Sequence, residues 1–140
     1  MAASRAGADG KSLEDKLGIG PDTVHVLLHP PAGFALRGGI AQRNLLPPVD
    51  VIVTFHTQRA PLLAEWPKLT AAAEPAGAVW VAWPKPTSGV AAGITEDTLR
   101  ADLLPTGWVD NKTCSIDATW SALRFVQRVE RRRPRDRARR

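Results

Sequence analysis

A loop rich in hydrogen-bond donors follows the most apolar stretch of the chain. Lys85, Thr87, Ser88 and Gly89 come directly after the uninterrupted apolar run of residues 78–83. One ammonium group, two hydroxyls and a backbone amide can together hold a negatively charged group. We therefore expect a small anionic ligand, or the carboxylate of a peptide, to bind here. The alternative is a solvated loop whose hydroxyls only satisfy the amides of a turn.

A second group of polar and aromatic residues lies near the C-terminal end of the apolar part of the chain. Trp120 and Ser121 follow Asp117, and Arg124 comes three residues later. Trp120 can stack on a ligand, and we assign it with Ser121 to the same predicted ligand site as Lys85. The structural alternative is that Trp120 closes one end of the core while Asp117 caps a hairpin turn and Arg124 is an exposed strand residue.

The histidines and the single cysteine predict neither a metal site nor a catalytic site. His25 and His29 are four residues apart, which on a strand places both on one face, but no third ligand follows at a useful spacing. His56 ends the next strand and would lie near His29 across the sheet. Cys114 is expected to be a buried, inert thiol. Neither a nucleophile elbow nor a phosphate-binding loop occurs, so catalysis is not predicted.

The sequence pattern predicts alternating strands and helices, and these elements must position the candidate site residues. β-branched and apolar residues fill segments 23–29 and 49–56, and the run 78–83 has the composition of a strand buried on both faces. Between the last two strands, residues 59–73 repeat apolar side chains at helical spacing. Pro67 interrupts this helix, which predicts a kink or two short helices. Strand, helix and strand with short connections predict a parallel βαβ unit.

The C-terminal part predicts one more helix and an antiparallel hairpin. Thr95 has the side chain of a helix N-cap, with Glu96 and Asp97 in the first turn. Segments 109–116 and 122–129 read as strands, and the short link between them makes them antiparallel. The predicted fold is α/β: a small, mostly parallel sheet with helices on its faces and a C-terminal antiparallel hairpin.

Charge is distributed unevenly along the 140 residues. Segment 128–140 contains eight arginines and two acidic residues, whereas the preceding 127 residues carry a net charge of −1. We expect a disordered leader over residues 1–11, one domain over 12–129 and a basic, disordered tail over 130–140. The tail can attract nucleic acid or an acidic protein, and the arginines that would do so are Arg131, Arg132, Arg133 and Arg135. The alternative is a tail that only keeps the protein in solution.

Several segments resemble a bacterial family of small proteins known only as a domain of unknown function. They are Trp83-Pro84-Lys85 with Ser88-Gly89, Thr95-Glu96-Asp97, and the segment 117–125. The resemblance covers roughly residues 13–127. It implies a Rossmann-like, methyltransferase-related fold and no established activity. More broadly, the Asp-Val-Ile-Val strand at residues 50–53 resembles a strand in the C-terminal half of the Rossmann-like methyltransferase core.

The chain departs from working methyltransferases at the cofactor turn. Such enzymes have a glycine-rich turn after the first strand, whereas His29 is followed here by Pro30 and Pro31, which lack amide donors. We therefore expect no cofactor. The function expected from the sequence is a non-catalytic module, cytoplasmic and without a membrane segment, that binds a small ligand or a partner. Nucleic-acid or acidic-partner binding through the tail, and a divergent transferase, are the alternatives.

Overall fold

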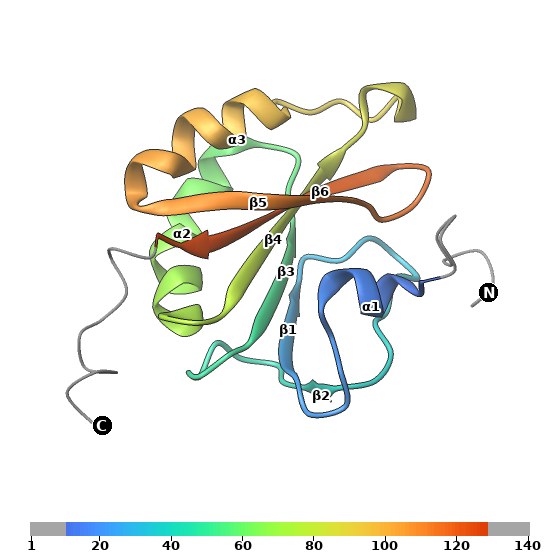
Figure 1. Cartoon of the computed structure of the whole chain (residues 1–140). Coiled ribbons are helices and arrows are strands. Elements are labelled where there is room, and N and C mark those ends of the chain that lie inside the picture. Colours follow the sequence, from blue (N-terminus) through green and yellow to red (C-terminus); the bar gives the residue numbers. More distant parts are fainter. Residues whose placement is uncertain (1–10, 129–140) are drawn as a thin grey trace.

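The described part of the chain forms one six-stranded sheet with helices on both faces (Figure 1). The computed structural model describes residues 11–128. Its strands are β1 (Val24–Leu28), β2 (Ile40–Ala41), β3 (Val51–Phe55), β4 (Ala78–Pro84), β5 (Trp108–Ser115) and β6 (Trp120–Gln127), in the spatial order β2-β1-β3-β4-β6-β5. The first four strands are parallel, and β6 is antiparallel to both β4 and β5. The predicted α/β class, with a mostly parallel sheet and a C-terminal hairpin, is confirmed.

Two hydrophobic clusters lie on opposite faces of the sheet. Helices α2 (Arg59–Ala73) and α3 (Glu96–Leu103) contribute Leu62, Trp66 and Leu99 to one cluster. Helix α1 (Leu13–Leu17) contributes to the other, on the opposite face, together with Phe34 from the loop after β1. In Figure 1, α1 accordingly lies on the other side of the sheet from α2 and α3.

The βαβ unit forms as its composition predicts. Every residue of β3 and of β4 is buried, because each of these strands is covered on both faces. A kink or a division was expected at Pro67; the helix between the two strands is a single continuous element, so it is not divided into two short helices. Pro67 and Leu63, whose carbonyl loses its donor, are both exposed. Water can therefore satisfy that carbonyl, which makes the missing hydrogen bond tolerable.

The C-terminal hairpin is confirmed with shifted ends. Both strands begin at a tryptophan, β5 at Trp108 and β6 at Trp120, so the turn takes only the residues between Ser115 and Trp120. Asp117 Oδ1 accepts hydrogen bonds from the amides of Thr119 and Trp120, each at 2.8 Å. The prediction that Asp117 caps the turn is therefore confirmed.

Helix α3 begins at the residue that the sequence indicated. The Thr95 hydroxyl accepts from the Thr98 amide at 3.2 Å, and the Thr98 hydroxyl accepts from the Thr95 amide at 2.9 Å. Ile94 and Leu99, which flank this cap, are both buried. The cap thus satisfies two amides that no helical carbonyl can reach.

Thr95→Ala is expected to lower the free energy of unfolding by about 1 kcal/mol, because it removes the acceptor at the N-cap. Thr95→Asp keeps an acceptor and adds a charge that the helix dipole favours, so it should stay close to wild type. Urea denaturation of the variants measures both values. Equal losses for alanine and aspartate would show that the cap does not stabilise α3.

Candidate functional site

The order of the parallel strands reverses between β1 and β3. From β1 the chain moves outward to β2, and it then returns past β1 to β3 and continues to β4. In open α/β sheets, ligands bind beyond the carboxyl ends of the strands near such a reversal. The residues that follow β1, β3 and β4 are His29, His56 and Lys85, and all three therefore lie along this edge of the sheet.

Lys85 leads into a single turn of 3₁₀ helix, Pro86–Ser88, that closes at Gly89 with φ of 79°. Its ammonium group donates to Ser115 Oγ at 2.6 Å, at the end of β5. The Ser88 hydroxyl donates to the Lys85 carbonyl at 2.7 Å and accepts from the amide of Val90 at 3.1 Å. Ser88 therefore stabilises the turn, while Thr87 and Gly89 are exposed.

Trp120 and Ser121 lie next to the Lys85 loop in the sheet. They pair with Pro84 and Trp83 of β4, so the backbone brings the two halves of the predicted ligand site together. The half-buried Trp120 ring packs edge-to-face on Phe55, with centroids 5.0 Å apart. Trp120 also lines a hollow of about 370 Å³ whose opposite wall is the segment 31–35. Binding of an anion by Lys85, Thr87, Ser88, Gly89, Trp120 and Ser121 stays a prediction.

The histidines that follow β1 and β3 lie against a carboxylate from α2. His29 Nε2 lies 2.9 and 3.0 Å from the two carboxylate oxygens of Glu65, and His56 Nε2 lies 3.5 Å from Oε1. The two imidazole rings are in edge-to-face contact, with centroids 5.2 Å apart. The expected proximity of His29 and His56 is confirmed. The third group was missed because Glu65 belongs to the crossover helix rather than to a nearby strand.

The two imidazoles of this cluster have different surroundings. His29 has a left-handed backbone with φ of 55° and an exposed side chain, whereas His56 is buried. Burial lowers the pKa of His56, an effect that the Glu65 carboxylate opposes and that His29 reinforces. A lowered pKa favours the neutral ring, which is the form that offers a lone pair to a ligand. Thr54 Oγ1 lies 2.8 Å from His56 Nε2 and is its buried hydrogen-bond partner.

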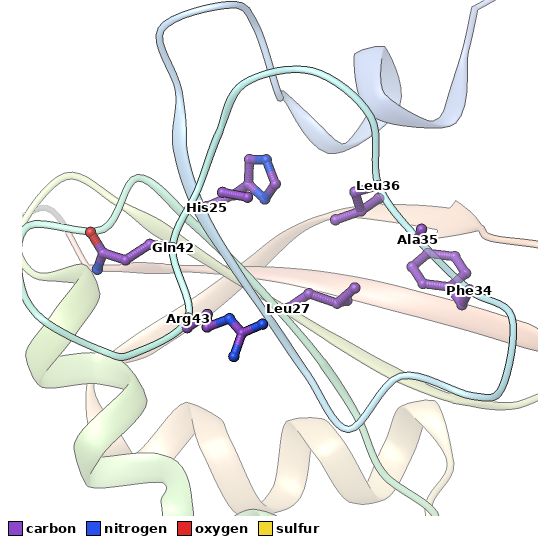
Figure 2. A pocket seen from close by; sticks show the side chains of 8 residues that line it. His25, Leu27, Phe34, Ala35, Leu36, Gln42 and Arg43 are labelled. Atoms are coloured by element: carbon purple, nitrogen blue, oxygen red, sulfur yellow. The ribbon is translucent and has the colours of Figure 1, made fainter.

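A groove of about 630 Å³ lies on the α1 face of the sheet, beside the edge strand (Figure 2). His25 and Leu27 of β1 form its floor. The loop residues 34–36 line one side, and Ala41, Gln42 and Arg43 line the other.

The pairing of β1 with β2 places Arg43 beside Leu27. Val24 and His25 pair with Ile40 and Ala41, and the same register continued by two residues brings Arg43 opposite Leu27. Figure 2 shows the Arg43 side chain reaching toward Leu27.

His25 is held firmly at the upper end of this groove. Its Nε2 is 2.9 Å from the Gly38 carbonyl, which can only accept, so Nε2 carries the proton. Gly39 follows with φ of 67°, and a Cβ at this position would lie 2.8 Å from the His25 ring. Within residues 11–128, the buried Nδ1 of His25 has no hydrogen-bond partner. The sequence did not indicate the groove, because the loop that forms one of its sides has no regular periodicity.

The remaining predicted sites are outside this region. The arginines of the tail, Arg131 to Arg135, and most of the expected leader lie outside the described residues. Cys114 is buried, and burial raises the pKa of its thiol against the opposing effect of Lys16 and Lys85. The expected buried thiol is therefore confirmed. Within residues 11–128, no helix is long and apolar enough to cross a membrane.

Comparisons with known proteins identify no relative of this chain. No protein-family model, no curated protein and no solved structure matches the chain. The assignment of function therefore depends on the chemistry of the groove and of the sheet edge.

Proposed function

We propose that the protein is a small-ligand-binding module whose ligand is an organic anion with an apolar body, held in the groove over β1. The observation that carries the proposal is the combination, in one groove, of apolar side chains with one guanidinium. Leu27, Phe34 and Leu36 supply the apolar surface, and Arg43 supplies the charge. The volume of about 630 Å³ lies within the range of pockets that hold small molecules.

The charge of Arg43 is available to a ligand. Its side chain is exposed, and within the described part of the chain it forms no ion pair. A guanidinium beside apolar surface favours a carboxylate, since its planar donors match two oxygens. Leu27 and Leu36 are half-buried without a ligand, so an apolar group over them would remove further hydrocarbon surface from water.

A binding role without catalysis agrees with a Rossmann-like fold that has lost its cofactor turn. The support for this reading is the parallel β1-β3-β4 sheet, followed by the antiparallel β6 and β5, together with prolines where a cofactor turn needs amides. Membership of the bacterial methyltransferase-like family and a place in the cytoplasm belong to the same proposal. Nucleic-acid or acidic-partner binding by the tail rests on its charge, and a divergent transferase rests on the family resemblance.

The proposal is tested with 3-phenylpropionate, a carboxylate with an apolar body, and with its neutral amide as the matched probe. Calorimetric titration of the full chain should detect the carboxylate and show much weaker binding of the amide. Arg43→Ala should weaken carboxylate binding on the order of 10–100-fold, because a hydrogen bond to a charged group contributes about 1.5–3 kcal/mol. Arg37→Ala removes an exposed arginine from the same loop region but outside the groove, and it should leave binding unchanged.

Lys85→Ala separates the groove from the predicted site at the sheet edge. Its affinity for the carboxylate should equal that of the wild type if the groove is the site. Loss of binding in Lys85→Ala, with Arg43→Ala unaffected, would move the anion to the Lys85 loop and overturn the groove assignment. Equal binding of the carboxylate and the amide would contradict an anion site altogether.

A further inference from the structure

Three side chains from separate elements converge at the strand-order reversal, on the opposite face from the groove. One ring nitrogen of His29, one of His56 and a carboxylate oxygen of Glu65 all lie within 4.8 Å of one another. His29 follows β1, His56 follows β3, and Glu65 projects from α2. Two imidazoles and one carboxylate are the donor set that binds zinc at many sites with three protein ligands.

The spacing of the ligand atoms fits a metal ion. A tetrahedral ion with bonds of about 2.0–2.1 Å places its ligand atoms roughly 3.3 Å apart. Both histidines approach the same oxygen of Glu65, because Oε1 is 3.0 Å from His29 Nε2 and 3.5 Å from His56 Nε2. All three ligand atoms lie within 4.8 Å of one another, so side-chain adjustment within the cluster would bring them to one ion. Bound at His56 Nε2, it would replace the hydrogen bond to Thr54.

The cluster combines a rigid side with an open side. His56 is fixed directly after β3, since its side chain is 4% exposed and its amide donates to the Ala82 carbonyl at 3.0 Å. The side chains of His29 and Glu65 are 49% and 34% exposed, so both meet solvent. Three ligands with one accessible side leave a fourth position for water or for a ligand atom. The buried His56 Nε2 faces both Thr54 Oγ1 at 2.8 Å and Glu65 Oε1 at 3.5 Å, so a second imidazole nitrogen lies beside the His29–Glu65 pair.

We propose that His29, His56 and Glu65 form a binding site for a divalent transition-metal ion, with one coordination position open to solvent. Nitrogen and oxygen ligands without a thiolate suit zinc and its neighbours in the first transition series. The site is independent of the carboxylate groove, because the two share no residue. It lies where the strand order of an open sheet favours ligand binding.

The experiment uses the full chain and Zn²⁺ alone, in a buffer that does not bind metals. Calorimetric titration should show a single zinc ion per chain. His29→Gln and Glu65→Gln should each weaken binding by at least the 10–100-fold that is lost even when a residue supporting a ligand is changed. Both side chains are partly exposed, so both variants should keep the circular dichroism spectrum of the wild type. Glu74→Gln, at the C-terminal end of α2, is the matched control and should bind as the wild type does.

Cobalt provides a readout that a merely structural role would not change. Co²⁺ bound to the wild type should give the intense visible bands of a tetrahedral site without a thiolate-to-metal band, and Glu65→Gln should lose them. Zinc should also raise the melting temperature of the wild type and not that of His29→Gln. Absence of zinc binding, or wild-type affinity in both glutamine variants, would overturn the proposal. A thiolate band would assign the metal to Cys114 and overturn it as well.

Discussion

Trp80→Ala is expected to lower the free energy of unfolding by about 3–5 kcal/mol, the range found when a large buried aromatic is truncated. Trp80 is 1% exposed and lies in the middle of β4, in the cluster that joins the sheet to α1. Its indole Nε1–H donates to the Leu17 carbonyl at 3.0 Å, at the last residue of α1. The substitution therefore leaves a cavity and also removes the hydrogen bond that ties this helix to the sheet.

Urea denaturation followed by circular dichroism measures the loss, and Trp80→Phe divides it into two parts. Phenylalanine fills most of the space but has no donor, so the Leu17 carbonyl loses its indole partner. The expected loss for phenylalanine is about 1–3 kcal/mol, smaller than for alanine. Equal losses for the two variants would show that the hydrogen bond, rather than the volume of the ring, dominates at this position.

Gly77→Ala is expected to destabilise the protein by about 3 kcal/mol, at the upper end of the usual range for overpacked sites. A Cβ on Gly77 would overlap the Val49 carbonyl oxygen and would lie 2.6 Å from the Ala73 carbonyl oxygen. Both are backbone atoms and cannot move aside as a flexible side chain would. Ala73 ends α2 and Gly77 precedes β4, so the clash would separate the helix from the strand that follows it.

Gly20→Ala is the matched control for this prediction. A Cβ at Gly20 would meet Thr23 Oγ1 at 3.7 Å, which is an ordinary van der Waals contact. The free energy of unfolding should then change by less than about 1 kcal/mol, because alanine mainly restricts the unfolded chain. Thermal and urea denaturation of both variants provide the comparison. A Gly77→Ala protein as stable as Gly20→Ala would mean that the turn before β4 adapts without strain.

The elements that the sequence predicted best are those with a local cause. The helix over residues 59–73 has the predicted ends, because apolar spacing and flanking residues determine them within a few turns. The cap at Thr95 is equally local. The ends of the hairpin strands were one or two residues off, since Trp108 and Trp120 extend the ladder through pairing that no local pattern records.

The candidate sites could be predicted only in part, because contacts between distant segments create them. The proximity of His29 and His56 follows from two adjacent parallel strands, which a reading of the strands can anticipate. Glu65 lies beside them because of the orientation of α2 about its own helix axis. The apolar stripe of α2 determines that orientation only approximately. The groove depends on how the irregular segment between β1 and β2 folds back over Leu27, and this is decided by tertiary packing.

The two outermost strands determine how the protein meets its neighbours. Strand β2 offers only Ile40 and Ala41 for pairing, and two prolines, Pro47 and Pro48, follow within a few residues. At the opposite border, β5 has an irregular register between Asp110 and Lys112 and presents exposed polar side chains. Brevity on one side, and distortion with charge on the other, discourage a foreign strand from adding to a sheet. The sheet is therefore protected against edge-to-edge association with other sheets, even though its interior strands are among the most apolar segments of the chain.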